Sequence, residues 1–110
     1  MYLVLVILYR EEQLDDILSV FAELGLENAV VVEGTRMQEV LAFDVPIFAG
    51  LAAGSQGGKH YIKIVMAMCR EDGIARKIAN VAKDLDIDLS NRDVGTILTL
   101  PVKEDVTPED

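Results

Sequence analysis

Two cations flank a glycine-rich segment of the chain, and they are the residues best suited to bind an anionic ligand. Lys59 follows Gly57 and Gly58 and stands where this segment meets an apolar run that begins at Tyr61. A lysine ammonium at such a junction can meet an anion; the alternative is a solvated lysine beside a strand. Arg36 enters from the other end of the same segment.

The glycines at 54, 57 and 58 allow two interpretations. Glycine backbones can bring their N–H groups together as an anion-binding nest, or they can act as a flexible hinge. A P-loop is excluded, because Lys59 is followed by His60 rather than by Ser or Thr.

Catalytic and metal-binding patterns are weak in this chain. It contains one histidine, His60, and one cysteine, Cys69, so no Ser/His/Asp or Cys/His arrangement can be recognised. The acidic run 84–88 begins like a calcium-binding loop, but Leu89 and Gly95 occupy the positions that need a glycine and a bidentate acid. We therefore expect neither an enzyme nor a metal site.

An apolar stretch over residues 45–53 lies within a segment that should be exposed. Ile47, Phe48 and Leu51 are its large apolar side chains. Exposed apolar patches usually mark contact surfaces, so the pattern favours contact with a partner protein or a neighbouring subunit. Local self-packing of the stretch is the alternative.

Composition and charge exclude several functional classes. The 110 residues carry a net charge of −9 at pH 7, which disfavours nucleic-acid binding because phosphates need matched cations. The N-terminal apolar run stops at Arg10, which makes it too short for a membrane span, and it lacks the basic start of a signal peptide. Together with the single cysteine, these features predict a cytoplasmic protein without membrane insertion.

The hydropathy pattern predicts two βαβ units in one domain. The predicted strands are 2–9, 29–33, 61–69 and 96–102, and the predicted helices are 11–24 and 72–85, with a helix-compatible piece at 37–43. This order is an α+β fold, a ferredoxin-like βαββαβ sandwich with a four-stranded antiparallel sheet and two helices on one face. We expect the domain to span 1–103, with a long loop at about 34–59, and a disordered acidic tail to follow at 104–110.

The apolar content of the strands exceeds what two helices can bury. The first predicted strand is apolar on both of its faces, and the third carries a single charged residue, Lys63. In a sheet covered on one side only, the strands should alternate apolar and polar residues. Another copy or a partner must therefore bury the second face, and the pattern predicts a homo-oligomer.

The order of elements, the long loop and the apolar second face resemble the PII family of nitrogen regulatory, signal-transduction proteins. The matching runs are Leu14 to Ile17, Glu23 to Gly25, Val30 to Glu33 and Lys59 to Val65. The resemblance implies a homotrimer whose sheets face inward, with nucleotides bound in the clefts between subunits. It also implies that the long loop, called the T-loop in that family, controls a transporter, an enzyme or a regulator.

The same resemblance implies which residues hold the effector. The ligand-binding residues that it implies are Lys59, Arg36, Gln38, Arg92 and Gly95. The effector that it implies is an adenine nucleotide, ATP, ADP or AMP, or another small anion. The turn before the last strand departs from the family pattern, because Thr96 stands where a lysine is expected and Asp93 would repel a phosphate.

The sequence thus predicts a PII-like regulator that binds a small anionic effector between subunits and controls a partner protein through its loop. The alternative is a CutA-like trimeric protein that binds divalent metals, which shares the fold and the assembly. Such a metal site would require several histidine or cysteine ligands, and the chain offers one of each.

Overall fold

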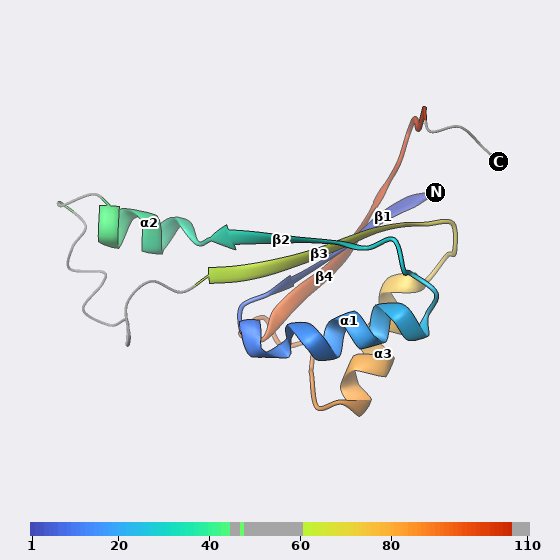
Figure 1. Cartoon of the computed structure of the whole chain (residues 1–110), viewed down its shortest axis with the longest axis horizontal. Coiled ribbons are helices and arrows are strands. Elements are labelled where there is room, and N and C mark those ends of the chain that lie inside the picture. Colours follow the sequence, from blue (N-terminus) through green and yellow to red (C-terminus); the bar gives the residue numbers. More distant parts are fainter. Residues whose placement is uncertain (45–46, 48–60, 107–110) are drawn as a thin grey trace.

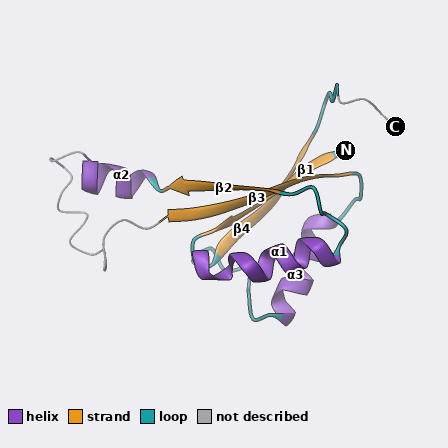
Figure 2. Cartoon of the chain, in the orientation of Figure 1, coloured by secondary structure: helices purple, strands orange, loops and turns teal. Residues whose placement is uncertain are grey.

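A computed structural model describes residues 1–44, 47 and 61–106 of the chain. Its elements alternate as the hydropathy pattern predicts, with a four-stranded antiparallel sheet and helices that pack on it (Figures 1 and 2). The predicted α+β class and the antiparallel sheet are confirmed, and the architecture is compatible with a ferredoxin-like fold. Among the described residues, no helix combines the length and the apolar character needed to cross a membrane.

The sheet has the strand order β2-β3-β1-β4, and every neighbouring pair is antiparallel. The strands are β1 (Tyr2–Leu8), β2 (Val30–Thr35), β3 (Tyr61–Cys69) and β4 (Gly95–Pro101). The two strands richest in apolar residues, β1 and β3, take the two central positions. Central strands are flanked on both sides by hydrogen-bonded neighbours, so their side chains are the most shielded from water.

Two helices cover one face of the sheet, α1 (Leu14–Glu23) and α3 (Ile74–Asp84) (Figure 1). A short 3-10 turn, η1 (Glu11–Gln13), leads into α1. Both helices end in the same way: the residue after the cap adopts a left-handed conformation, and the next N–H reaches back five residues to a helix carbonyl. Gly25 fills this position after α1, as its place in the sequence suggests, whereas Asp86 fills it after α3.

The core lies between these helices and the covered face of the sheet. Alternate residues of β1 point into it, and Val4, Val6 and Leu8 are fully buried. The helices contribute the other half of the core. Their buried side chains are Ile17, Val20, Phe21, Ile74, Ile78 and Ala82.

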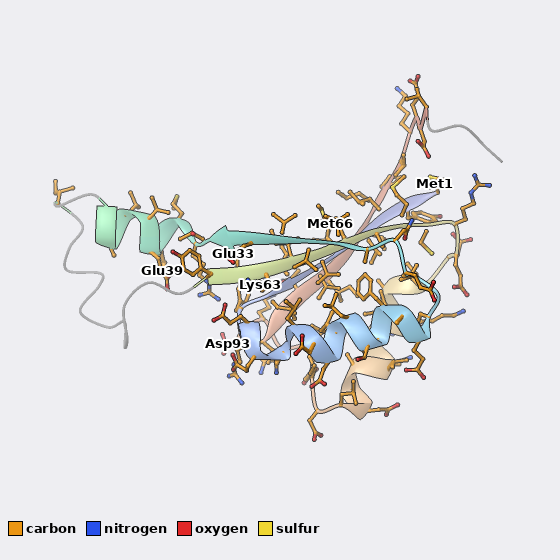
Figure 3. The ribbon with its side chains drawn as sticks, in the orientation of Figure 1. Met1, Glu33, Glu39, Lys63, Met66 and Asp93 are labelled. Carbon is orange, nitrogen blue, oxygen red and sulfur yellow. The ribbon has the colours of Figure 1, made fainter. Side chains whose placement is uncertain are left out.

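The opposite face of the sheet, called the open face below, is covered by none of the described helices (Figure 3). The strand register places on it every residue that alternates with the covered set, and Figure 3 shows Met66 on this side. Its only members that are not large apolar residues are Gly34 and Thr96. The apolar members are Leu3, Leu5, Ile7, Val30, Val32, Ile62, Ile64, Met66, Met68, Leu98 and Leu100.

A third helix, α2 (Met37–Asp44), follows directly on β2 and lies beyond the end of the sheet, away from α1 and α3 (Figure 1). It matches the helix-compatible piece of the sequence. Its first residue, Met37, is 72% exposed. Large apolar side chains that are exposed often mark contact surfaces, which makes α2 a candidate contact element.

The element boundaries differ from the predicted ones where pairing or chain geometry decides them. β2 continues to Thr35, two residues past the predicted end, because Gly34 and Thr35 still pair with Ile62 and Tyr61 of β3. α3 begins at Ile74 rather than near 72, because Gly73 adopts a left-handed conformation just before it. The predicted disorder of 104–110 stays a prediction, and residues 107–110 lie outside the described part of the chain.

Gly95 is required where β4 meets β1, and replacing it should destabilise the fold. A Cβ atom at this position would lie 2.5 Å from the carbonyl oxygen of Ile7, which belongs to the rigid central strand. We expect Gly95→Ala to lower the free energy of unfolding by about 1–3 kcal/mol, as overpacking does in a core. Urea denaturation at one fixed protein concentration measures this change.

Gly34→Ala is the matched control for that experiment. Its Cβ would meet only side chains, those of Ile62 at 3.2 Å and Ile64 at 3.9 Å, and a side chain can rotate away where a strand carbonyl cannot. The explanation for Gly95 is wrong if both alanine variants lose the same stability.

Candidate functional site at the base of the long loop

The long segment between β2 and β3 leaves the sheet and returns to it at one place. Thr35 and Tyr61 form the last pair of the β2–β3 ladder, so the segment from Arg36 to residue 60 starts and ends at neighbouring points. The two residues that flank it are therefore paired side by side although they are 26 positions apart in sequence. We call this place the loop base.

Tyr9 connects the loop base to the turn that precedes β4. The guanidinium carbon of Arg36 lies 3.9 Å from the centroid of the Tyr9 ring, which is a cation–π contact. The backbone N–H of Tyr9 donates a hydrogen bond of 3.2 Å to the carbonyl oxygen of Val94. One residue at the end of β1 thus touches the start of the long segment and the turn before the last strand.

Arg36 also holds the beginning of α2. Its carbonyl oxygen accepts the backbone N–H groups of Glu39 and Val40, at 3.0 and 3.1 Å. These are the first backbone hydrogen bonds of the helix, so the residue that stacks on Tyr9 with its side chain anchors α2 with its backbone. A ligand that moves the Arg36 side chain would therefore act directly on the first turn of α2.

A small cavity of about 180 Å³ opens at the loop base. It is lined by two phenol rings, one guanidinium, one carboxylate and one aliphatic chain, those of Tyr9, Tyr61, Arg36, Glu39 and Ile62. Aromatic faces and a guanidinium together suit a planar or anionic group, which can stack on the rings and bond to the cation. At this volume, only part of a larger ligand could enter.

A charged pair lies next to the loop base on the covered face of the sheet. Lys63 and Glu33 are directly opposite each other in the β2–β3 ladder, and the Lys63 Nζ donates a hydrogen bond of 2.7 Å to the Glu33 Oε2 (Figure 3). This hydrogen bond raises the pKa of Lys63 above the ordinary lysine value; partial desolvation opposes the shift, and the charges of Glu33 and Glu11 support it. The lysine therefore stays charged beside the site.

In the turn before β4, backbone N–H groups donate hydrogen bonds to acceptors within the turn itself. Asn91 accepts the N–H groups of Val94 and Gly95 with its carbonyl oxygen and the N–H of Asp93 with its side-chain oxygen. A cradle for phosphates needs such N–H groups to point outward and to be unoccupied. In this turn the three are bonded internally, so a ligand at the loop base has to rely on side chains.

The residues predicted to bind the effector lie in different parts of the structure. Arg36 lies in the cavity at the loop base. Gln38 is exposed on α2, and Arg92 is exposed in the turn, two residues before the Val94 carbonyl that Tyr9 contacts. Gly95 is buried, and its close approach to Ile7 gives it a packing role. Lys59 lies outside the described residues.

The predicted partner-binding residues are described in part. Ile47 is 83% exposed, as a contact residue would be, while Phe48 and Leu51 lie outside the described residues. Reasoning from the sequence missed Tyr9 and Tyr61. Both stand at the ends of predicted strands, and that placement was the only signal that could have drawn attention to them.

The part of the chain that the structure describes contains no cluster of side chains that could bind a metal ion. No group of three or more His, Cys, Asp and Glu side chains converges there. The thiol of Cys69 is half-buried and accepts the backbone N–H of Glu71 at 3.2 Å, and His60 lies outside the described residues.

Comparison with known proteins assigns no family to the chain. No family model matches it, and no curated protein matches it significantly.

The Lys63–Glu33 pair predicts a measurable pH dependence. Because the folded pKa of Lys63 is raised, the pair stabilises the fold fully below the ordinary lysine pKa, and this contribution is lost as the pH rises through the raised value. We expect Glu33→Gln to lower the Lys63 pKa, and its stability deficit relative to the wild type to shrink at high pH. Side-chain NMR titration and urea denaturation at several pH values measure the two effects.

Glu23→Gln is the control, because it removes an equal charge from the far end of α1. It should leave the Lys63 titration unchanged. An identical Lys63 pKa in the wild type and in Glu33→Gln would show that the pair does not hold the lysine's charge.

Proposed function

We propose that the protein is a PII-like regulator, which binds a small anionic effector at the loop base and passes this signal to a partner protein through α2 and the segment that follows. The observation that carries the proposal is the double role of Arg36. Its side chain faces the cavity and stacks on Tyr9, while its carbonyl holds the first turn of α2. One residue thus contacts both the proposed effector site and the helix proposed to contact the partner.

The chemistry of the cavity supports an anionic effector with a planar part. Tyr61 is 41% exposed and offers a ring on which a nucleobase can stack, and Arg36 offers a guanidinium to a phosphate or carboxylate. The charge of Lys63 is balanced by Glu33, and Lys59 would add a cation from the other end of the segment. An adenine nucleotide fits this description, held by side chains rather than by the turn before β4.

The output surface would be the apolar side of α2 and the segment beyond it. Met37 and Val40 are exposed one helical turn apart, and Ile47 is exposed further along. Side chains at such spacing are the anchors that a helix inserts into a groove of another protein. The proposed partner is a regulated transporter, enzyme or regulator in the cytoplasm.

The open face of the sheet supports a homo-oligomer, and we propose the trimer of the family that the chain resembles. Full burial of a large apolar side chain is worth about 1.5–3 kcal/mol, so gaining half of that for the eleven on the open face gives roughly 8–16 kcal/mol. This is comparable to the roughly 4–15 kcal/mol that association costs. A second copy is the partner always present at the concentration of the protein itself.

Ligand screening followed by mutation of Arg36 tests the effector proposal. A thermal-shift screen over ATP, ADP, AMP, cyclic nucleotides, 2-oxoglutarate and bicarbonate should find a ligand that raises the melting temperature, because binding to the native state stabilises it. Charge-assisted hydrogen bonds are worth about 1.5–3 kcal/mol, so Arg36→Ala should weaken this ligand about ten- to a hundredfold by calorimetry.

Lys103→Ala is the control, because it removes an exposed cation after β4, at the opposite end of that strand from the loop base. It should bind the ligand like the wild type. Unchanged affinity in Arg36→Ala, with fold and oligomer intact, would contradict the proposed site, as would a screen in which no anion stabilises the protein.

A further inference from the structure

A second hollow, of about 370 Å³, lies between α3 and the turn at residues 88–90. It shares no residue with the loop-base cavity. Its floor is apolar: Leu89 is buried, and Ala75, Ala79 and Ile97 are partly buried. The two alanines leave room on the side of α3 where larger side chains would fill the space.

The rim of this hollow is polar and carries more positive than negative charge. Arg76, Asn80 and Lys83 stand at i, i+4 and i+7, which places them along one side of α3. In a chain of net charge −9 with ten lysines and arginines, two of the ten line this one hollow. Within the described residues, the side chains of Arg76 and Asn80 make no hydrogen bond or ion pair, so their side-chain donors are available.

The one carboxylate of the rim, Asp88, is already engaged. It accepts hydrogen bonds from the Ser90 hydroxyl and from the Ser90 backbone N–H, the latter at 3.0 Å. These bonds keep the pKa of Asp88 below its ordinary value, with a smaller contribution from the charge of Lys83. Asp88 therefore stays ionised and offsets one of the two cations, which leaves Arg76 as the uncompensated charge.

We propose that this hollow binds a small organic anion, whose carboxylate or phosphate group lies by Arg76 and Asn80 and whose short apolar body lies on the floor of Ala75, Ala79, Leu89 and Ile97. A cationic rim over an apolar floor selects ligands that carry both features. An inorganic anion lacks the apolar body, and an alcohol lacks the charge. Since the rim is exposed to solvent, the affinity is weak and sensitive to salt.

NMR titration of the full chain, with backbone amides observed, tests this site. The probes are butyrate, inorganic phosphate and butanol, which supply both features, the charge alone and the apolar chain alone. Butyrate should shift the amides of 75–83, 88–90 and 97 at lower concentration than either other probe. Arg76→Gln should weaken butyrate binding about three- to tenfold, within the range expected for a partly screened charge-assisted contact.

Two further variants make the test decisive. Asp88→Asn keeps an oxygen that can accept the Ser90 bonds but removes the competing charge, so butyrate should bind about two- to fivefold tighter, the effect of one nearby exposed charge. Lys77→Gln removes an equal charge from the same helix, but Lys77 pairs with Glu71 and does not line the hollow. It should bind butyrate like the wild type.

Three outcomes would overturn the proposal: equal binding of butanol and butyrate, equal loss in Arg76→Gln and Lys77→Gln, or no shift at these amides. Equal binding of butanol and butyrate would show that the hollow binds only the apolar chain. An equal loss in the two variants would show that binding responds only to the net charge of the protein. The amides of Arg36 and Tyr61 report on the loop base separately, so failure at one site is distinguishable from failure at the other.

Discussion

The structure depends on one imbalance: a sheet has two faces, and the described helices bury only one. α1 and α3 close the core over Val4, Val6 and Leu8, whose side chains are fully removed from water. The residues between them, Leu3, Leu5 and Ile7, are as apolar but lie on the open face. Because the hydrophobic effect scales with the apolar area left in water, covering this face would stabilise the protein, and we propose that a second copy covers it.

The same sheet also determines where the loop base forms. Antiparallel pairing of β2 with β3 brings both ends of the long segment to one edge of the molecule, and β1 ends beside them. Tyr9 then touches Arg36 with its ring and Val94 with its backbone. A change at this place can move α2 without disturbing the core, because α2 lies beyond the sheet and packs on neither covering helix (Figure 1).

Helices and strands could be predicted from the sequence wherever the apolar residues of a segment followed one clear helical or strand pattern. The nine residues of β3 carry a continuous apolar run with a charge only at Lys63, and the strand was predicted with its observed bounds. The end of α1 was predicted from Gly25, whose left-handed conformation suits glycine. The end of α3 was predicted at residue 85, one residue past the observed Asp84, although Asp86 rather than a glycine adopts the left-handed conformation after it.

The candidate site was less accessible to such reasoning, because it depends on register and on contacts between distant strands. The Lys63–Glu33 pair exists only because β2 and β3 are aligned with those residues opposite each other. The contact of Arg36 with Tyr9 joins residues 27 positions apart, and no local pattern encodes it. Gly95 was predicted as a ligand-binding glycine, whereas the structure gives it a packing reason, the nearby Ile7 carbonyl.

An isotope-filtered NMR experiment on a mixed sample tests the central claim, that the open face joins copies of this chain. Methyl-labelled and unlabelled subunits are unfolded together, refolded and examined for NOEs between copies. The account predicts such NOEs at the methyl groups of Leu5, Ile64 and Leu98, and their loss in Met66→Glu, which places a charge on that face; Val31→Glu, on the other face, should retain them. A monomeric wild type without NOEs between copies, or NOEs confined to residues of α1 and α3, would contradict the account.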